Sequence, residues 1–271
     1  MGLRVNTNIF SLTAQRNLNN VTSRLQGNFS RLSSGLRIAN ASDDAAGLGI
    51  SERMRAQIQS YGAASRNAQD GISLVQTAES ALGETGSSLA RMRELAVQAA
   101  NGTLNTQDRG TINSEFVALA TEITRIADQT EFNGIKLLNN TNGIDIQVGL
   151  DTGDSITITN TDNDATSLNI NALTTTTTTN AVSALATIDA AIDSVTSSRG
   201  ALGAAQNRLQ SVFRSILGAS ENLSAAESRI RDVDVAFETA DLTRNSILQQ
   251  ASVSILSQAN TQPQLALSLL G

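Results

Sequence analysis

The side chains that could carry chemistry in this sequence of 271 residues are carboxylates and hydroxyls, because it contains neither cysteine nor histidine. It therefore has no disulfide framework, no zinc-finger ligand set, and no Cys or His nucleophile, base or metal ligand. A metal site of carboxylates and carbonyls, or a pair of acids of the glycosidase type, remains open. Composition thus predicts a protein that is not an enzyme and binds no cofactor.

Two groups of acidic residues are candidates for such sites. Asp43 and Asp44 precede an alanine-rich segment, and carboxylates are favoured there by the dipole of the helix that follows. Asp232, Asp234 and Glu238 lack the glycine and the ligand spacing of an EF-hand loop. We expect the first pair to start a helix. The second group is expected to form a solvated helix face or a salt link to the basic N-terminal segment, so no metal site is predicted.

Three stretches match the N-glycosylation pattern, beginning at Asn28, Asn101 and Asn222. This pattern is short enough to recur by chance, and two of the three lie in segments predicted as helices, so we assign them no role. Residues 160–180 are dominated by Thr, Asn and Asp and include a run of six threonines. Such a composition predicts a surface loop or an extended connection.

The elements that hold these residues must be built from aliphatic side chains. Hydrophobic residues make up 40% of the sequence but aromatic residues only 3%, and there is a single proline. Aliphatic side chains suit thin helix–helix contacts and proline breaks helices, so a mainly helical protein is predicted. The net charge of −6 argues against nucleic acid as a partner. No segment resembles a cleavable secretion signal or a membrane span, so no membrane insertion is expected.

The strongest pattern is an apolar stripe in the C-terminal part. Its members are spaced alternately by three and four residues, which is the heptad pattern of a helix packed on other helices. They are Leu202, Ala205, Leu209, Val212, Ile216, Ala219, Leu223, Ala226, Ile230, Val233, Phe237 and Ala240. One helix over this stripe would span about 58 Å, more than the roughly 50 Å diameter of a compact protein of this length, so an elongated rod is predicted.

Shorter stripes and one alternating segment complete the pattern. Similar helical stripes lie within residues 18–32, 75–99, 112–126 and 182–195. Apolar residues alternate with polar ones over 144–150 and again at 156–158, on either side of turn residues, which predicts a β-hairpin.

The two ends of the chain have apolar stripes but no local partner. Residues 1–66 hold eight arginines and three acids, whereas residues 221–271 hold six acids and three arginines, so the ends could attract each other or those of neighbouring copies. The last apolar face consists of Leu265, Leu267, Leu269 and Leu270. We expect both ends to be disordered in the monomer and helical after assembly.

Several strings resemble bacterial flagellin, in the same order and at both ends of the chain. They are RVNTNIFSLTAQRNLNN (residues 4–20), RLSSGLRIANASDDAAGLGIS (31–51), LARMRELAVQ (89–98), EFNGIKLL (131–138) and the terminal LSLLG. The resemblance covers roughly residues 1–160 and 181–271. It implies a mainly α fold, an elongated antiparallel helical bundle or coiled coil with one small β-hairpin and paired terminal helices.

The resemblance also implies a domain organisation. Residues 1–43 plus 233–271 would form a terminal helix pair that lines the core of a filament, and residues 44–140 plus 181–232 would form a helical rod domain. Residues 141–180, with the β-hairpin and a short Thr-rich connection, would stand in place of variable outer domains.

The implied function is that of a structural subunit of the flagellar filament, which polymerises with copies of itself for swimming motility. The subunit would be exported unfolded through the flagellar type III apparatus and become extracellular. Its implied partners are an export chaperone, the filament cap and hook-junction proteins. The implied assembly seam is Leu18, Val21, Leu25, Phe29, Leu32, Ile230, Val233, Phe237, Ala240 and Ile247.

Two further surfaces follow from the resemblance. In that family a vertebrate innate immune receptor recognises a surface whose matching positions are Arg91, Leu95 and Glu115, which would also contact other subunits. Some flagellins carry O-linked sugar in their exposed middle, and the matching candidates are Thr174, Thr175, Thr176, Thr177, Thr178 and Thr179.

Two alternatives to a filament subunit remain at the level of sequence. A hook-filament junction protein shares the terminal patterns but ends the polymer, and a monomeric secreted helical adhesin would use the hairpin and the Thr-rich loop for binding. Heptads of Ala, Leu and Ile also occur in intramolecular bundles, so periodicity alone does not distinguish them from polymer contacts.

Overall fold

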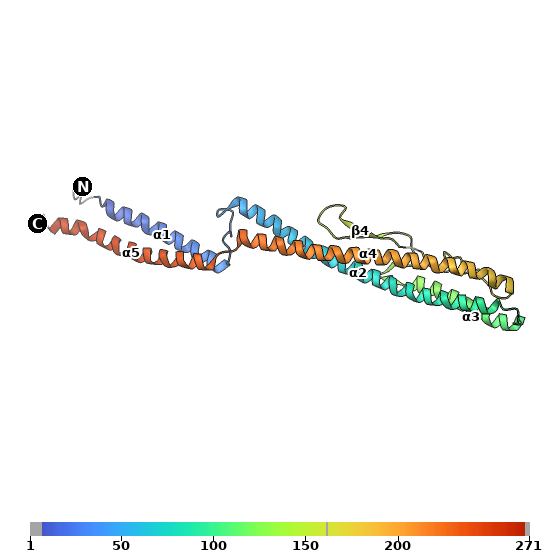
Figure 1. Cartoon of the computed structure of the whole chain (residues 1–271). Helices are drawn as coiled ribbons and strands as arrows, with labels where there is room; N and C mark the ends of the chain where they lie inside the picture. The colour runs from blue at the N-terminus through green and yellow to red at the C-terminus, as the bar shows by residue number, and fades with distance from the viewer. Residues whose placement is uncertain (1–6, 161, 269–271) are drawn as a thin grey trace. The chain divides into compact units, whose positions relative to one another are not determined.

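The computed structural model describes residues 7–160 and 162–268, and it describes the side chains of the last helix as far as Thr261. The described residues form five helices and four short strands (Figure 1). In chain order they are α1 (Ile9–Ser34), α2 (Ala45–Ala99), α3 (Thr106–Gln129), β1 (Glu131–Phe132), β2 (Ile135–Lys136), β3 (Ile144–Gln147), β4 (Ser155–Ile158), α4 (Thr178–Arg231) and α5 (Val235–Ser268). The prediction of a mainly α fold is confirmed. The apolar face predicted for the last four leucines lies outside the described side chains.

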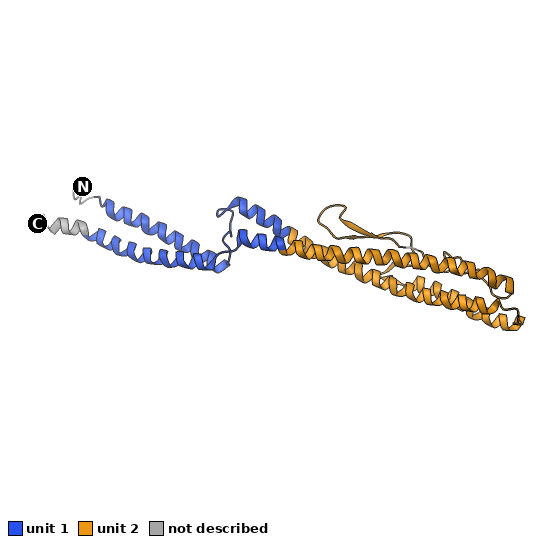
Figure 2. Cartoon of the chain, in the orientation of Figure 1, with its two compact units in different colours: residues 1–56, 222–271 blue, residues 57–221 orange. Residues whose placement is uncertain are grey.

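The chain divides into two compact units (Figure 2). The terminal unit contains residues 1–56 and 222–271, and the central unit contains residues 57–221. These bounds differ from the predicted division after residues 43 and 232, because the first turns of α2 and the last turns of α4 group with the terminal helices. Arg231 of α4 forms an ion pair there with Glu52 of α2, with 2.7 Å between Nη1 and Oε1.

In the terminal unit, α1 and α5 pack side by side in antiparallel orientation (Figure 1). Near the start of α1, Ser11 Oγ donates to Oδ1 of Asn260 at 2.7 Å, and near its end Asn28 Nδ2 donates to Oε1 of Glu238 at 2.5 Å. Helix α1 ends at Gly35, whose φ of 70° is the left-handed conformation that suits glycine after a helix. The chain then turns toward α2.

The continuous helix predicted from the C-terminal apolar stripe is wrong, because α4 ends at Arg231, before the stripe does. The break contains neither glycine nor proline, so contacts with another segment impose it. The N–H of Val233 donates to the carbonyl of Gly35 at 3.0 Å, and the N–H of Arg37 donates to the carbonyl of Arg231 at 2.7 Å. These bonds occupy backbone groups that a continuous helix would pair internally.

The break also moves the buried row of α5 by one residue. As far as Ile230 the members of the stripe are buried or half-buried, as predicted. Beyond the break, Phe237 and Ile247 are exposed, whereas Glu238 and Asn245 are buried. A shift of one residue turns a helix by about 100°, so a different face of α5 lies against α1 from the one predicted. The inward row of α5 is Glu238, Leu242, Asn245, Gln249, Ser252, Leu256 and Ala259.

The central unit packs α3 and parts of α2 and α4 around an apolar core. Every member of the stripe predicted at residues 75–99 is buried, and Phe116 and Ile123 of the next stripe are fully buried. The largest fully buried side chains of this unit are Phe116, Leu82, Leu89, Met92, Leu95, Ile123, Leu137, Ile158, Ile170, Ile188 and Leu209. The core is therefore aliphatic with one central phenylalanine, as the composition predicted.

Two short antiparallel hairpins belong to the central unit. The predicted hairpin is confirmed, since β3 pairs with β4 and Ile144 lies opposite Ile158. A second hairpin of β1 and β2, absent from the prediction, pairs Phe132 with Ile135. Its turn residues Asn133 and Gly134 have φ values of 50° and 79°. Asn-Gly between apolar residues is the usual signal for such a turn, so the sequence contained the information.

The polar stretch over residues 160 and 162–180 is more buried than the predicted surface loop. Ala165, Leu168 and Ile170 are buried in the central core. Thr175 is also fully buried, and its N–H donates to Oδ1 of Asn113 on α3 at 2.8 Å. The prediction failed because three apolar residues among many polar ones suffice to anchor a connection when a core lies beside it.

Candidate functional site

The acidic groups with possible chemistry have structural roles. Asp44 starts α2, because its Oδ1 accepts from the N–H of Gly47 at 2.9 Å, as predicted. Asp43 accepts from the N–H groups of Asn40 and Ala39, and these bonds lower the pKa of its carboxyl. Asp234 accepts from two N–H groups in the first turn of α5. Across residues 7–160 and 162–268, no three carboxylates lie close enough to hold a metal ion.

A buried polar cluster joins α1 to α5, and we call its members Asn28, Glu238 and Asn245 the Asn28 cluster. Their exposed fractions are 6%, 4% and 8%. Asn28 donates to Glu238 at 2.5 Å and accepts from Nδ2 of Asn245 at 2.8 Å. Arg31 Nη1 lies 3.8 Å from Oε1 of Glu238, which agrees with the predicted salt link to the basic N-terminal segment. The two asparagines were not predicted as buried, because they lie between the apolar positions of the predicted stripes and not on them.

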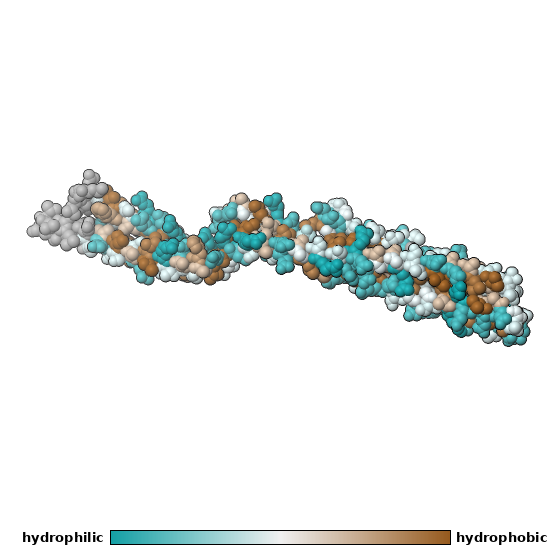
Figure 3. All heavy atoms as spheres, in the orientation of Figure 1, coloured by the Kyte–Doolittle hydropathy of each residue, from teal (hydrophilic) through white to brown (hydrophobic). Residues whose placement is uncertain are grey.

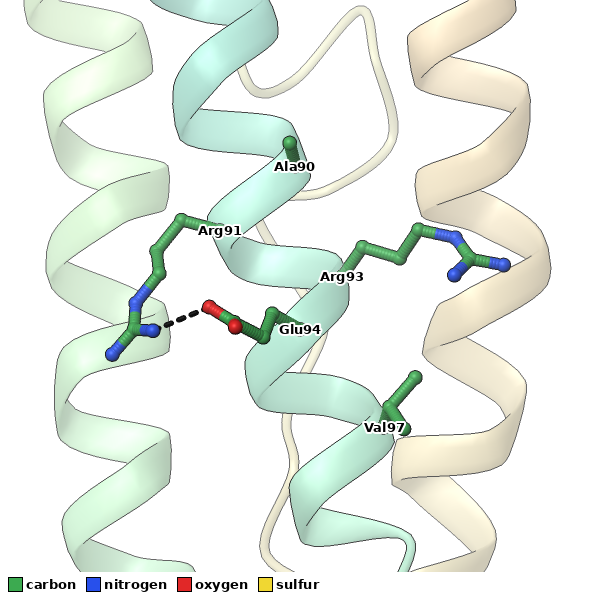
Figure 4. A pocket seen from close by; sticks show the side chains of 5 residues that line it. All are labelled: Ala90, Arg91, Arg93, Glu94 and Val97. Carbon is green, nitrogen blue, oxygen red and sulfur yellow. Dashed lines mark hydrogen bonds and ion pairs between the residues drawn. The ribbon is translucent and has the colours of Figure 1, made fainter.

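The candidate receptor surface lies on α2 beside a shallow hollow of about 570 Å³ (Figure 4). Arg91 points toward α3, where its Nη2 lies 2.9 Å from Oε1 of Glu115, and it also pairs with Glu94 on its own helix. Hydrogen bonds to Glu94 and then Glu115 raise the pKa of Arg91 above its ordinary value. All three side chains are largely exposed, so the structure brings Arg91 and Glu115 together on one accessible surface.

Leu95 does not belong to that surface. Its side chain is 1% exposed and packs in the central core, where it is among the largest fully buried side chains. It follows Met92 by three residues on α2, and Met92 is also buried, so both lie on the inward face of the helix. The candidate surface is therefore corrected to Arg91 and Glu115, together with the other residues that line the hollow, Ala90, Arg93, Glu94 and Val97.

Arg93 joins α2 to α4 on the opposite side from Arg91 (Figure 4). Its Nε donates to Oδ1 of Asp189 at 2.6 Å. This hydrogen bond, with a smaller contribution from the positive charge, lowers the pKa of Asp189 below 3.8. The pKa of Asp189 is therefore lower in the folded chain than in the unfolded chain. The ion pair with Arg93 stabilises the fold at pH values above the pKa of the unfolded chain. This stabilisation is lost as the pH falls through the pKa of the folded chain.

Replacing Asp189 with asparagine is expected to remove part of the acid sensitivity of the central unit. The melting temperature of the unmodified chain should fall more steeply than that of D189N between about pH 4 and pH 2. Thermal melts followed by circular dichroism across this range measure the difference. The matched control is D193N, an exposed acid one turn further along α4, which should keep the slope of the unmodified chain. Equal slopes for D189N and the unmodified chain would contradict the assignment.

The threonine run, residues 174–179, leads into the start of α4, and most of its side chains are exposed. Thr177 Oγ1 accepts from the N–H of Asn180 at 3.2 Å, and Thr174 Oγ1 accepts from Nδ2 of Asn180 at 3.1 Å. The burial of Thr175 removes it from the sugar candidates. The remaining five threonines are exposed.

Uncovered apolar side chains concentrate on the terminal helices. Of the sixteen large apolar side chains that are exposed among the described residues, ten lie on α1 and α5. Figure 3 shows such residues reaching the face in view over these helices. In the predicted assembly seam, the half-buried members are Leu18, Val21, Leu25, Leu32, Ile230 and Val233, and the exposed members are Phe29, Phe237, Ala240 and Ile247. Large contiguous apolar surfaces usually mark contacts with other molecules.

The long helices with uncovered apolar side chains define a class, that of mainly helical proteins whose surfaces are suited to contacts with other molecules. Among the described helices, none is long and apolar enough to cross a bilayer. The family model of the bacterial flagellin N-terminal helical region matches residues 5–143, and that of the C-terminal helical region matches residues 185–270. The chain belongs to the bacterial flagellin family, whose members are structural proteins rather than enzymes.

Individual relatives match over nearly the whole chain. A flagellin of Halalkalibacterium halodurans is 50% identical over 269 residues, which cover 98% of this chain and 99% of the relative. A flagellin of Bacillus subtilis is 44% identical and covers 99% of this chain and 100% of the relative. Among solved structures, Bacillus cereus flagellin is 35% identical, with a TM-score of 0.52 over 60% of this chain and 94% of that chain.

Proposed function

We propose that this chain is the structural subunit of an extracellular flagellar filament and polymerises with copies of itself. The observation that carries the proposal is the match of both flagellin helical regions in a chain whose terminal helices leave ten large apolar side chains uncovered. Contacts between different faces of identical subunits generate an open helical polymer when they do not close into a ring. Many such contacts along a filament add up to a stiff structure.

Within that polymer, residues 1–43 with 233–271 would line the core, and residues 44–140 with 181–232 would form the rod domain. The antiparallel packing of α1 on α5 supports the first assignment. In the described part of the middle, residues 141–160 and 162–180, the chain forms one hairpin, a folded connection and the start of α4, which supports a filament without projecting outer domains.

We extend the proposal to the route of assembly. The chain would pass unfolded through the flagellar type III apparatus, with a chaperone holding its C-terminal region, and would be added beneath a filament cap beyond the hook-junction proteins. The absence of cysteine supports such passage, because no disulfide has to form or open on the way. O-linked sugar, if attached to the middle, would be carried by exposed threonines that accept none of the hydrogen bonds above, namely Thr176, Thr178 and Thr179.

Seeded growth tests the proposed function directly. Purified chain is added to short fragments of flagellar filament, and filament length is followed by electron microscopy. Long filaments are the expected result. Binding at filament ends without elongation would instead identify a hook-filament junction protein, and a chain that stays monomeric with ordered termini under all conditions would identify a secreted adhesin.

Recognition by a vertebrate innate immune receptor is proposed for the Arg91 and Glu115 surface of the monomer. Replacing Arg91 or Glu115 with alanine should lower receptor activation in a cell reporter assay by about tenfold, the effect expected of a central contact residue. Arg125→Ala is the matched control, because Arg125 is also an exposed arginine that pairs with a glutamate, Glu122. Equal activation by R91A, E115A and R125A would contradict the proposed surface.

A further inference from the structure

Asparagine is followed directly by glycine at three places in the central unit, residues 101–102, 133–134 and 142–143. Glycine has no side chain, so its backbone nitrogen can approach the side-chain carbonyl carbon of the asparagine before it. Attack of that nitrogen on the carbon closes a succinimide ring and expels ammonia. All six residues are exposed, so exposure alone does not decide which pair reacts.

The pair at Asn101 lies in the turn between α2 and α3 and has a donor at the reacting group. The N–H of Thr103 donates to Oδ1 of Asn101 at 3.2 Å. Attack on Cγ places negative charge on this oxygen, and an N–H group already in place there stabilises the charge as it develops. The N–H of Gly102 makes no hydrogen bond to any described residue, so the attacking nitrogen is free.

The pair at Asn133 is held in a different geometry. Asn133 and Gly134 form the turn between β1 and β2, with φ values of 50° and 79°. The strands pair directly on either side, Phe132 opposite Ile135. The oxygen Oδ1 of Asn133 accepts no hydrogen bond from the residues that the structure describes. Ring closure here would have to distort a turn that the hairpin holds, without a donor to stabilise the charge.

The region around Asn142 separates the two requirements. Asn142 is followed by Gly143, but its Oδ1 accepts no hydrogen bond from the described part of the chain. Asn140 has the donor, since the N–H of Asn142 donates to its Oδ1 at 2.9 Å, but the residue after it is Thr141. Glycine and a placed donor therefore occur together at Asn101 and at neither of these two residues.

We propose that Asn101 is a self-modification site, at which the folded central unit speeds conversion of the amide to aspartate and isoaspartate. The nitrogen of Gly102 bonds to Cγ of Asn101 and gives up its proton. The bond from Cγ to Nδ2 breaks, and Nδ2 leaves with that proton as ammonia. Water then opens the ring at one of its two carbonyl carbons, which gives aspartate or isoaspartate. The reaction consumes only water.

The product changes the end of α2. It places a carboxylate just beyond the last turn of the helix, where the helix dipole disfavours negative charge. Isoaspartate also adds one carbon to the backbone, which displaces the carbonyl of residue 101. Arg109 holds that carbonyl, because its Nη2 donates to it at 2.8 Å. The central unit alone contains this site, so the proposal does not depend on the terminal helices or on the proposed function.

The test follows conversion in unassembled full-length chain at neutral pH, with and without urea. Peptide mapping by mass spectrometry, with fragmentation, places the mass change on one residue and distinguishes isoaspartate from aspartate. In the folded chain Asn101 should convert about tenfold faster than Asn133 or Asn142, because it alone of the three has the donor. Urea removes the donor and opens the turns, so the three rates should converge, whereas Asn140 should stay slow in both conditions.

The variant G102A tests the attacking nitrogen. A methyl group beside that nitrogen hinders its approach, so conversion at Asn101 should slow by about tenfold. A Cβ at position 102 meets no atom within 4 Å, so the variant should fold normally. The matched control is G110A, at an exposed glycine of α3 with equally open surroundings, which should convert like the unmodified chain.

Three results would overturn the proposal. Asn133 or Asn142 could convert as fast as Asn101 in the folded chain, which would show that the donor has no effect. The order of rates could persist in urea, which would assign the selection to the sequence rather than to the fold. G102A could convert at the rate of the unmodified chain, which would exclude ring closure at this pair.

Discussion

Deleting residues 241–271 is expected to abolish polymerisation while leaving the central unit folded. The deletion removes most of α5, including the buried Asn245 and Ala259 of its inward row. Helix α1 then keeps half-buried side chains such as Leu18 and Val21 with nothing to cover them, and a lone helix of this length is marginal in water. The exposed apolar side chains of Ile247, Leu248, Val253 and Ile255 are lost in the same step.

The measurements are seeded elongation and circular dichroism. We expect no elongation and a cooperative melt from the central unit. A shorter deletion of residues 262–271 is a useful comparison, because it spares the inward row as far as Ala259. If the longer deletion polymerised at the rate of the intact chain, the proposal that the terminal helices mediate assembly would be contradicted.

Replacing Phe116 with alanine is expected to give the largest loss of stability among single substitutions in the central unit. Phe116 is fully buried in α3 and lies in a core built otherwise from Ala, Leu, Ile, Val and Met. Truncating a buried phenylalanine removes its apolar contacts and leaves a cavity, which together cost about 3–5 kcal/mol. Aliphatic neighbours packed at high density cannot collapse fully into that space.

Urea unfolding followed by circular dichroism measures this loss. The matched control is Val117→Ala, the next residue on α3, whose side chain is 44% exposed, and we expect it to change the free energy of unfolding by no more than about 0.5 kcal/mol. A loss below about 1 kcal/mol in F116A would show that the core around Phe116 repacks.

The candidate interaction surface came from the resemblance to flagellin and not from local patterns, and the structure changes it in two places. The resemblance implied a surface with Arg91 and Glu115, and these two residues form an ion pair. Leu95 stands in the same string as Arg91, yet its neighbours on the inward face of α2 were already visible as the stripe through Met92. The threonine run was predicted as a loop, and the burial of Thr175 depends on an asparagine of α3 that lies 62 residues earlier in the chain.

The sequence by itself determined the mainly helical fold, the stripes of the central core and the hairpin of β3 and β4. These features depend on apolar residues spaced by two, three or four positions. Such spacing can be recognised in the sequence without knowing which segment packs against it. Its composition also excluded every site that needs cysteine or histidine.

Only the tertiary structure decided where the long C-terminal stripe is interrupted and which row of α5 faces inward. The interruption exists because Gly35 and Arg37, far away in sequence, bind the backbone of residues 231–233. The inward row follows Glu238 and Asn245 rather than Phe237, because Asn28 satisfies both polar groups. Buried backbone and side-chain polar groups need hydrogen-bond partners, and here those partners lie far away in the sequence. The spacing of apolar residues along one helix does not predict such partners.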